Sequence, residues 1–112
     1  MQTPNYYLKC SNIGRMILSE TSFPISLFDN VCENVIDKYD LNFYEGSCLK
    51  YLWRLGNSGR SIKSDFEKAV NCANMTVERK NALKFFHEIA DMKNKHLIIE
   101  AKLGVVQSND FS

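Results

Sequence analysis

The chain has 112 residues, 45% of them hydrophobic and 24% charged, with a formal net charge of +1 at pH 7. These values predict one globular domain of residues 1–112 with a hydrophobic core, and they exclude a disordered chain. The near-neutral charge also excludes a global basic field for nucleic acid, so any anion site must be local.

The N-terminal third is predicted to hold an irregular arm followed by a helix. Residues 1–20 mix short apolar runs with Gly14 and give no clear period. The first helix is expected from about Ser22 to Tyr39, because Ser22 is a good N-cap and Pro24 suits the first turn. Apolar residues then recur at helical spacing. The opposite, acidic face carries Asp29, Glu33 and Asp37.

The middle of the chain predicts two further helices separated by a turn. The second helix is expected from Phe43 to Leu55, and the cluster Gly56-Asn-Ser-Gly59 ends it. Its buried face is expected to hold Phe43, Cys48, Leu49, Leu52 and Leu55. The third helix begins at Ser61 or Ser64, since Ser64 opens a capping-box pattern.

The C-terminal third predicts a long helix. It opens at about residues 74–76, as a fourth helix or a continuation of the third, and its apolar stripe runs to Leu103. Residues 104–112 are expected to form a flexible tail. The predicted fold is therefore an all-α bundle of three to four helices with a long C-terminal helix.

The four cysteines are expected to be free thiols. None forms a Cys-x-x-Cys pair, and some lie inside apolar helical stretches, where a cysteine acts as a small hydrophobe. No signal peptide is recognised, and no apolar run approaches the ~18 residues of a membrane helix. These features predict a cytoplasmic location without membrane contact. No histidine and cysteine spacing predicts a metal site.

The second helix carries basic residues on an otherwise apolar background. One face of this helix carries the polar and aromatic residues Ser47, Lys50, Tyr51 and Arg54, and Trp53 flanks this face. Arginine offers phosphate a planar fork of donors, and lysine offers a compact charge. Tyr51 or Trp53 could stack on a base. Asp65 and Lys68 of the next helix could fold back beside this face, which predicts a small nucleotide pocket.

A structural interpretation of the same residues stays open. Lys50 and Arg54 could be solvated helix-edge residues whose charges pair with Glu45 and Asp65. In that case the face would hold no ligand.

The string GSCLKYLWRLGN followed by SDFEKA resembles the signature of a family of small bacteriophage proteins that includes a phage nucleotide kinase. The family pattern is Gly-Asn-x-x-Lys-Tyr-x-x-Arg, a loop, then Asp-Leu-x-Lys-Ala, and the resemblance covers about residues 25–75. The matching residues are Gly46, Lys50, Tyr51, Arg54, Asp65, Lys68 and Ala69. Ser47 replaces the usual Asn and Phe66 the usual Leu, and SFPISLF stands where a His-Tyr pair commonly opens the family's domain.

The resemblance implies a phage or prophage nucleotide-binding protein acting in the host cytoplasm. Lys50, Arg54 and Lys68 would hold the phosphates. The protein would act as a sponge that sequesters a nucleotide or cyclic nucleotide from host immune signalling, or as a nucleoside-monophosphate-kinase-like enzyme that uses Mg²⁺. The missing His-Tyr pair favours the sponge.

Two alternatives follow from other surfaces. A small inhibitor of a host defence protein, of the anti-CRISPR or anti-restriction type, would mimic nucleic acid with the acidic residues Asp29, Glu33, Asp37 and Asp40. A helical assembly module would associate through exposed apolar residues of the last helix: Phe85, Phe86, Ile98 and Ile99. A homo-oligomer, a dimer or more, is expected under every interpretation.

Overall fold

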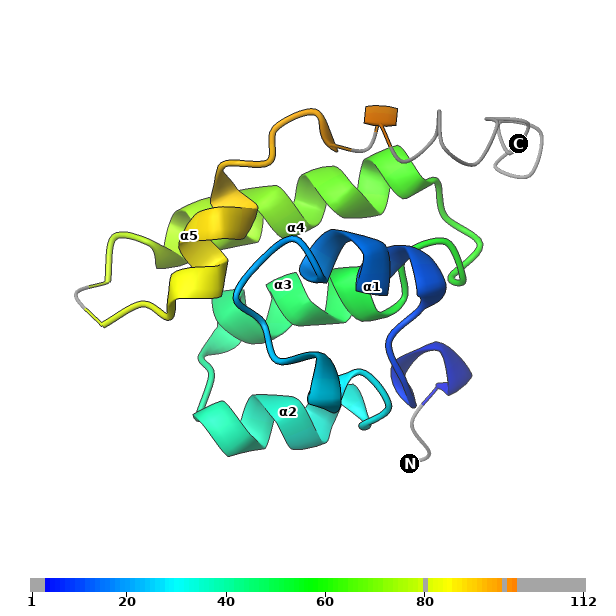
Figure 1. The fold of residues 1–112 in the computed structure, drawn as a ribbon, viewed down its shortest axis with the longest axis horizontal. Helices are drawn as coiled ribbons and strands as arrows, with labels where there is room; N and C mark the ends of the chain where they lie inside the picture. Colours follow the sequence, from blue (N-terminus) through cyan, green and yellow to red (C-terminus); the bar gives the residue numbers. More distant parts are fainter. Residues whose placement is uncertain (1–3, 80, 96, 99–112) are drawn as a thin grey trace.

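A computed structural model describes residues 4–79, 81–95 and 97–98, and this part of the chain contains helices and no strand. The all-α class is confirmed, but the described residues form five α-helices instead of three to four (Figure 1). Two short 3-10 helices accompany them. The elements are η1 (Asn5–Tyr7), α1 (Asn12–Leu18), η2 (Ile25–Leu27), α2 (Cys32–Tyr39), α3 (Phe43–Trp53), α4 (Ile62–Thr76) and α5 (Lys84–Ala90).

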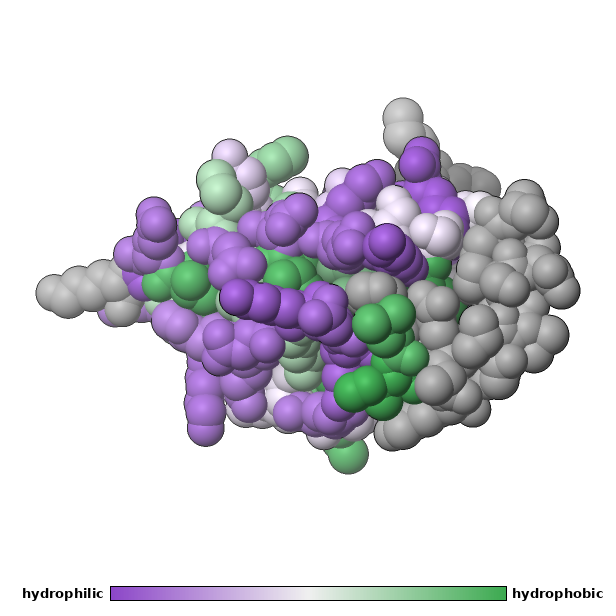
Figure 2. All heavy atoms as spheres, turned by 90° about the horizontal axis from the view of Figure 1, so that it is seen from above, coloured by the Kyte–Doolittle hydropathy of each residue, from purple (hydrophilic) through white to green (hydrophobic). Residues whose placement is uncertain are grey.

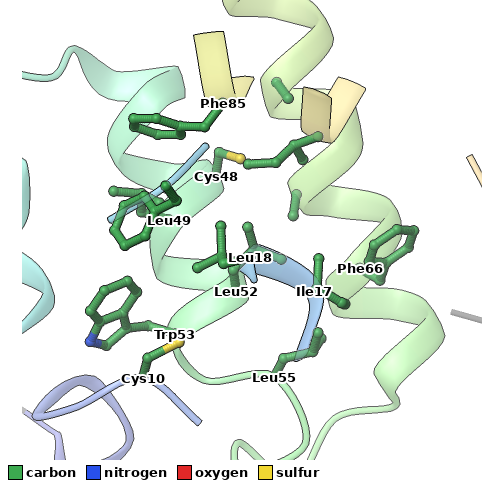
Figure 3. Close-up of a cluster of buried hydrophobic side chains, with 14 of the residues drawn as sticks. Cys10, Ile17, Leu18, Cys48, Leu49, Leu52, Trp53, Leu55, Phe66 and Phe85 are labelled. Carbon is green, nitrogen blue, oxygen red and sulfur yellow. The ribbon is translucent and has the colours of Figure 1, made fainter. Parts of the chain in front are cut away.

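α3 lies at the centre of the bundle (Figure 1). It contacts η1, α1, α2 and α4, while α5 packs on α4. Figure 3 shows the core that these helices share. Its largest wholly buried side chains include Ile17, Leu18, Leu49, Leu52, Trp53 and Phe66. Burial of this apolar surface is the main force that holds α3 in place.

Side-chain caps set the start of α3 and the start of α4. The Asn42 side chain accepts a hydrogen bond from the Glu45 backbone N–H at 2.8 Å, and the Glu45 carboxylate accepts one from the Asn42 backbone N–H at 2.9 Å. This capping box confirms the predicted start at Phe43. Ser61 caps α4 by accepting from the Ser64 backbone N–H at 2.9 Å, so Ser61 and not Ser64 is the cap.

The prediction of an irregular arm over residues 1–20 is wrong for residues 12–18, which form α1. Ser11 caps this helix through Gly14, and its own backbone N–H donates to the Trp53 carbonyl at 2.9 Å. A Cβ on Gly14 would lie 2.1 Å from the Leu52 carbonyl oxygen. α1 therefore docks directly on the C-terminal end of α3, an approach that only glycine allows.

The first predicted helix is shorter than expected, because η2 and a loop occupy residues 25–31 and α2 begins at Cys32. The Phe28 carbonyl accepts from the Cys10 backbone N–H at 2.7 Å, and the Asn30 carbonyl accepts from Trp53 Nε1 at 3.0 Å. These carbonyls bind other segments instead of continuing a helix. Asp29 consequently precedes α2.

The prediction of one long C-terminal helix is also wrong in the described residues. α4 runs to Thr76, and a turn separates it from the short α5. A straight continuation would carry Phe86 about 15 Å beyond Thr76, whereas the turn folds it back into the core. Phe85 is 4% exposed and Phe86 is wholly buried, so these two side chains do not form the surface expected to drive oligomerisation.

The face seen in Figure 2 is mostly hydrophilic, and hydrophobic side chains show at several separate places on it. Ile98 is exposed, while Ile99, Leu103 and the predicted tail of residues 104–112 lie outside the described residues. Within residues 4–79, 81–95 and 97–98, no helix combines the length and hydropathy that a membrane span requires.

Candidate anion-binding site

A hollow of about 280 Å³ opens beside the C-terminal half of α3. We call it the cation hollow, and its lining residues are Tyr7, Ser47, Lys50, Tyr51, Arg54, Arg60 and Lys68. The structure thus brings together Ser47, Lys50, Tyr51 and Arg54, which helical spacing placed on one face, and adds Lys68 from the next helix, which was expected to fold back beside them. Tyr7 and Arg60 join them from η1 and from the turn before α4.

Arg54 is the most firmly held of these cations. It is the C-terminal cap of α3, and its side chain is only 13% exposed. One terminal nitrogen donates to Asp65 Oδ1 at 2.9 Å, and the other donates to the Tyr7 hydroxyl at the long distance of 3.5 Å. Its Nε is buried and has no hydrogen-bond partner among the described residues. The guanidinium is therefore fixed at the wall of the hollow.

Asp65 lies beneath Arg54 and does not line the hollow. It is wholly buried, and its second oxygen accepts from the Ser58 hydroxyl at 2.9 Å. Burial by itself lowers the pKa of Arg54, but the hydrogen bond and charge of Asp65, together with Tyr7, raise it above its ordinary value. Asp65 therefore orients a permanently charged Arg54, and it is too deep to accept a hydrogen bond from a ligand.

The other three cations of the hollow are Lys50, Arg60 and Lys68. None of them forms an ion pair within the described residues. Glu45, the expected partner of Lys50, instead caps α3 and binds Arg79 at 2.9 Å. The structural interpretation therefore holds for the Arg54–Asp65 pair but not for a Lys50–Glu45 pair. Uncompensated positive charge around a concave surface favours binding of an anion.

The two predicted stacking residues make contacts within the protein. Trp53 is wholly buried among the core side chains (Figure 3), with its Nε1 on the Asn30 carbonyl, so its placement on the ligand-binding face is wrong. The Arg54 guanidinium lies 5.0 Å from the centre of the Tyr51 ring, and Lys68 Nζ lies 5.8 Å from it. Tyr51 therefore positions two cations by cation–π contact.

Tyr7 is a member of the site that sequence reasoning missed. It lies 47 positions before Arg54 in the chain, and no spacing rule connects them. Burial raises the pKa of its hydroxyl, although the charge of Arg54 opposes the shift. Tyr7 is therefore a neutral phenol at pH 7 and can donate a hydrogen bond to an anion.

Other reactive groups do not gather around the hollow. In the part of the chain that the structure describes, no three His, Cys, Asp or Glu residues lie close enough to hold a metal ion. Burial raises the pKa of Cys10 and Cys32 to about 12 and raises that of Cys48 well above its ordinary value. These thiols are protonated at neutral pH and are poor nucleophiles.

Comparisons with models of protein families, with curated proteins and with solved structures found no match. The residues of the hollow are thus the basis for assigning a function.

Proposed function

We propose that this chain binds the phosphate groups of a nucleotide or cyclic nucleotide in the cation hollow. One observation carries the proposal. Lys50, Arg60 and Lys68 reach a single hollow from α3, the following turn and α4, and none of them has an acidic partner in the described residues. Arg54 adds a fourth cation, and its charge is partly balanced by the buried Asp65 beneath it.

The chemistry of the lining suits phosphate. Arg54 and Arg60 present planar donor groups, and Lys50 and Lys68 add compact charges. The Ser47 and Tyr7 hydroxyls add neutral donors, which a phosphate can accept without further charge. Burial of Arg54 reduces the side-chain entropy that binding would otherwise cost.

Sequestration is a better match to this lining than phosphoryl transfer. A kinase of the resembled family would need a group to hold Mg²⁺ and a base for the acceptor hydroxyl. The lining residues of the described hollow include no carboxylate and no histidine. We therefore propose a phage-encoded sponge that withholds a nucleotide from host immune signalling, a role that the resemblance to the phage family supports.

Isothermal titration calorimetry with inorganic pyrophosphate, nucleoside mono- and diphosphates and cyclic dinucleotides tests the proposal. We expect binding that weakens with added salt, because the charges lie at the surface. The variant Lys50→Ala/Arg60→Ala should lose at least ten-fold in affinity. A phosphorus NMR assay with ATP, a nucleoside monophosphate and Mg²⁺ should detect no transfer.

The matched control is Lys38→Ala/Lys84→Ala, which removes the same charge from exposed positions on α2 and α5. It should bind like the unmodified protein. Equal losses in both variants would show that net charge, and not the hollow, attracts the anion. No binding of any probe by the unmodified protein would overturn the proposal.

An inhibitor of a host defence protein is the second candidate, and one observation favours it. Glu33, Asp37 and Asp40 are exposed and form no ion pair in the described residues, whereas Asp29 binds Arg15 at 2.7 Å. In a phage-protection assay, Glu33→Lys/Asp37→Lys should abolish function if this acidic face binds the partner. It should leave function intact if the cation hollow is the active surface.

A further inference from the structure

A second hollow of about 260 Å³ adjoins the cation hollow along α3. Ser47 and Lys50 line both of them. The remaining lining residues come from the end of α2, the α2–α3 turn and the first turn of α3: Ile36, Leu41, Asn42, Phe43 and Gly46. We call it the Phe43 hollow. Its walls are mainly apolar, in contrast to those of its neighbour.

We propose that the Phe43 hollow receives the base of the nucleotide whose phosphates occupy the cation hollow. This inference rests on the proposed function and adds to it the place where the ligand's aromatic part binds. Lys50 and Ser47, at the junction, would then lie beside the sugar and the first phosphate.

The dimensions of the two hollows support a shared ligand. Small-molecule pockets commonly have volumes of ~300–1,000 Å³. Each hollow alone, at about 280 and 260 Å³, lies just below that range, and the two together lie inside it. Phe43 and Lys50 are two turns apart on one face of α3, which is about 10 Å along the axis. That spacing suits a base and a phosphate joined through a sugar.

The side chains of the Phe43 hollow supply what the cation hollow lacks. Trp53 is buried and cannot stack on a base, and the Tyr51 ring contacts two of the cations. Phe43 is 78% exposed, so its predicted place on the buried face of the helix is wrong. Tyr44 packs against it in an edge-to-face arrangement with ring centres 5.4 Å apart. An exposed, supported ring beside a charged groove is the combination with which proteins hold nucleotide bases.

Gly46 of α3 and Ile36 of α2 lie next to each other in the lining of the Phe43 hollow. A Cβ at this position would lie 3.4 Å from Ile36 Cδ1, which is ordinary contact. Alanine is therefore tolerated here, and its methyl group would narrow the hollow without displacing the backbone. Gly46→Ala also favours the helical state, so a loss of binding would not reflect unfolding.

Calorimetry with a nucleoside diphosphate and with inorganic pyrophosphate separates the two hollows. The four ribonucleoside diphosphates serve as probes, and pyrophosphate reports the cation hollow alone. We expect at least one diphosphate to bind ten-fold or more tightly than pyrophosphate. We call the ratio of diphosphate affinity to pyrophosphate affinity the margin. Phe43→Ala should lower this margin about ten-fold, and Gly46→Ala should also lower it. Neither variant should change pyrophosphate affinity.

Two controls complete the test. Phe43→Tyr keeps the ring and should retain the margin. Met75→Ala removes an exposed apolar side chain from α4 and should bind both probes normally. If pyrophosphate binds as tightly as every diphosphate, or if Phe43→Ala keeps the full margin, this inference is overturned while the proposed function stands. If neither probe binds, this inference is overturned, and if the cyclic dinucleotides do not bind either, the proposed function itself fails.

Discussion

The two faces of α3 differ in what holds their side chains in place. On the buried face, Cys48, Leu49, Leu52 and Trp53 are wholly enclosed by neighbouring helices. On the cation face, Lys50 lies at the edge of a hollow and has no ion pair in the described residues. Apolar burial thus fixes the helix, and the helix in turn presents charges that contribute little to stability. The unpaired cations of this face can therefore be altered without loss of the fold.

Arg54 and Asp65 connect the two faces. Arg54 lines the hollow, whereas Asp65 on α4 is wholly buried. The Asp65 Oδ1 atom lies 2.9 Å from an Arg54 guanidinium nitrogen and forms an ion pair with it. Substitution of either residue should therefore lower the free energy of unfolding, as in the core, and should also weaken anion binding, as on the cation face.

Loss of the Trp53 side chain should have the largest effect. Trp53→Ala removes a wholly buried ring and leaves the Asn30 carbonyl without its donor. We expect the free energy of unfolding to fall by about 3–5 kcal/mol. Urea denaturation followed by far-UV circular dichroism is the measurement, because the chain has a single tryptophan and loses its fluorescence reporter. A loss below about 1 kcal/mol would show that this face of α3 is not the core.

Removal of the Asp65 carboxylate should have the next largest effect. Asp65→Ala leaves the mostly buried Arg54 guanidinium without its counter-charge and frees the Ser58 hydroxyl. We expect a loss of about 3 kcal/mol in unfolding free energy, together with weaker pyrophosphate binding because Arg54 is no longer oriented. Glu67→Ala, an exposed change in the same helix, should alter stability by less than about 0.5 kcal/mol. Equal effects in the two variants would contradict a structural role for the ion pair.

Sequence reasoning succeeded where the signals are local. The turn glycines Gly56 and Gly59, both with positive φ, mark the predicted turn between α3 and α4, and the predicted start of α3 at Phe43 agrees with the cap that Asn42 forms. Helical spacing then placed Lys50 and Arg54 on one face, as the structure shows.

Sequence reasoning failed where distant segments decide the structure. Trp53 could face either side of α3, and its hydrogen bond to the Asn30 carbonyl, 23 positions away, puts it in the core. Tyr7 reaches the hollow because η1 packs on α3, a contact between segments far apart in the sequence. The prediction of one long last helix did not take account of the apolar side chains that α5 buries when the chain turns back after α4. No periodicity within one segment records such contacts.

The buried thiols should make the free energy of unfolding depend on pH. Burial raises the pKa of Cys32 to about 12, although the charge of Lys50 opposes the shift. Below about pH 9 the thiol is protonated in both the folded and the unfolded state, so it does not make the free energy of unfolding depend on pH. Above it, only the unfolded state releases the proton, so the unfolding free energy falls as pH rises, by about 1.4 kcal/mol per pH unit for one thiol.

The measurement is urea denaturation between pH 8 and 11 for the unmodified protein and for Cys32→Ala. Lysine and tyrosine titrations are common to both proteins, so the difference between the two curves isolates the thiol. We expect the variant to lose stability less steeply. Parallel curves would show that Cys32 ionises as readily in the folded state as in the unfolded state.

Truncation of Lys50 should have the smallest effect on stability and a clear effect on binding. Lys50→Ala removes a half-buried side chain that has no ion pair in the described part of the chain. The unfolding free energy should change by less than about 0.5 kcal/mol. Pyrophosphate affinity should fall about ten-fold, since a charge-assisted hydrogen bond contributes about 1.5–3 kcal/mol. Denaturation and calorimetry on the same preparation provide both values. Lys38→Ala on α2 also removes one positive charge. It should change neither the free energy of unfolding nor the pyrophosphate affinity, because binding depends on where the charge lies and not on the net charge.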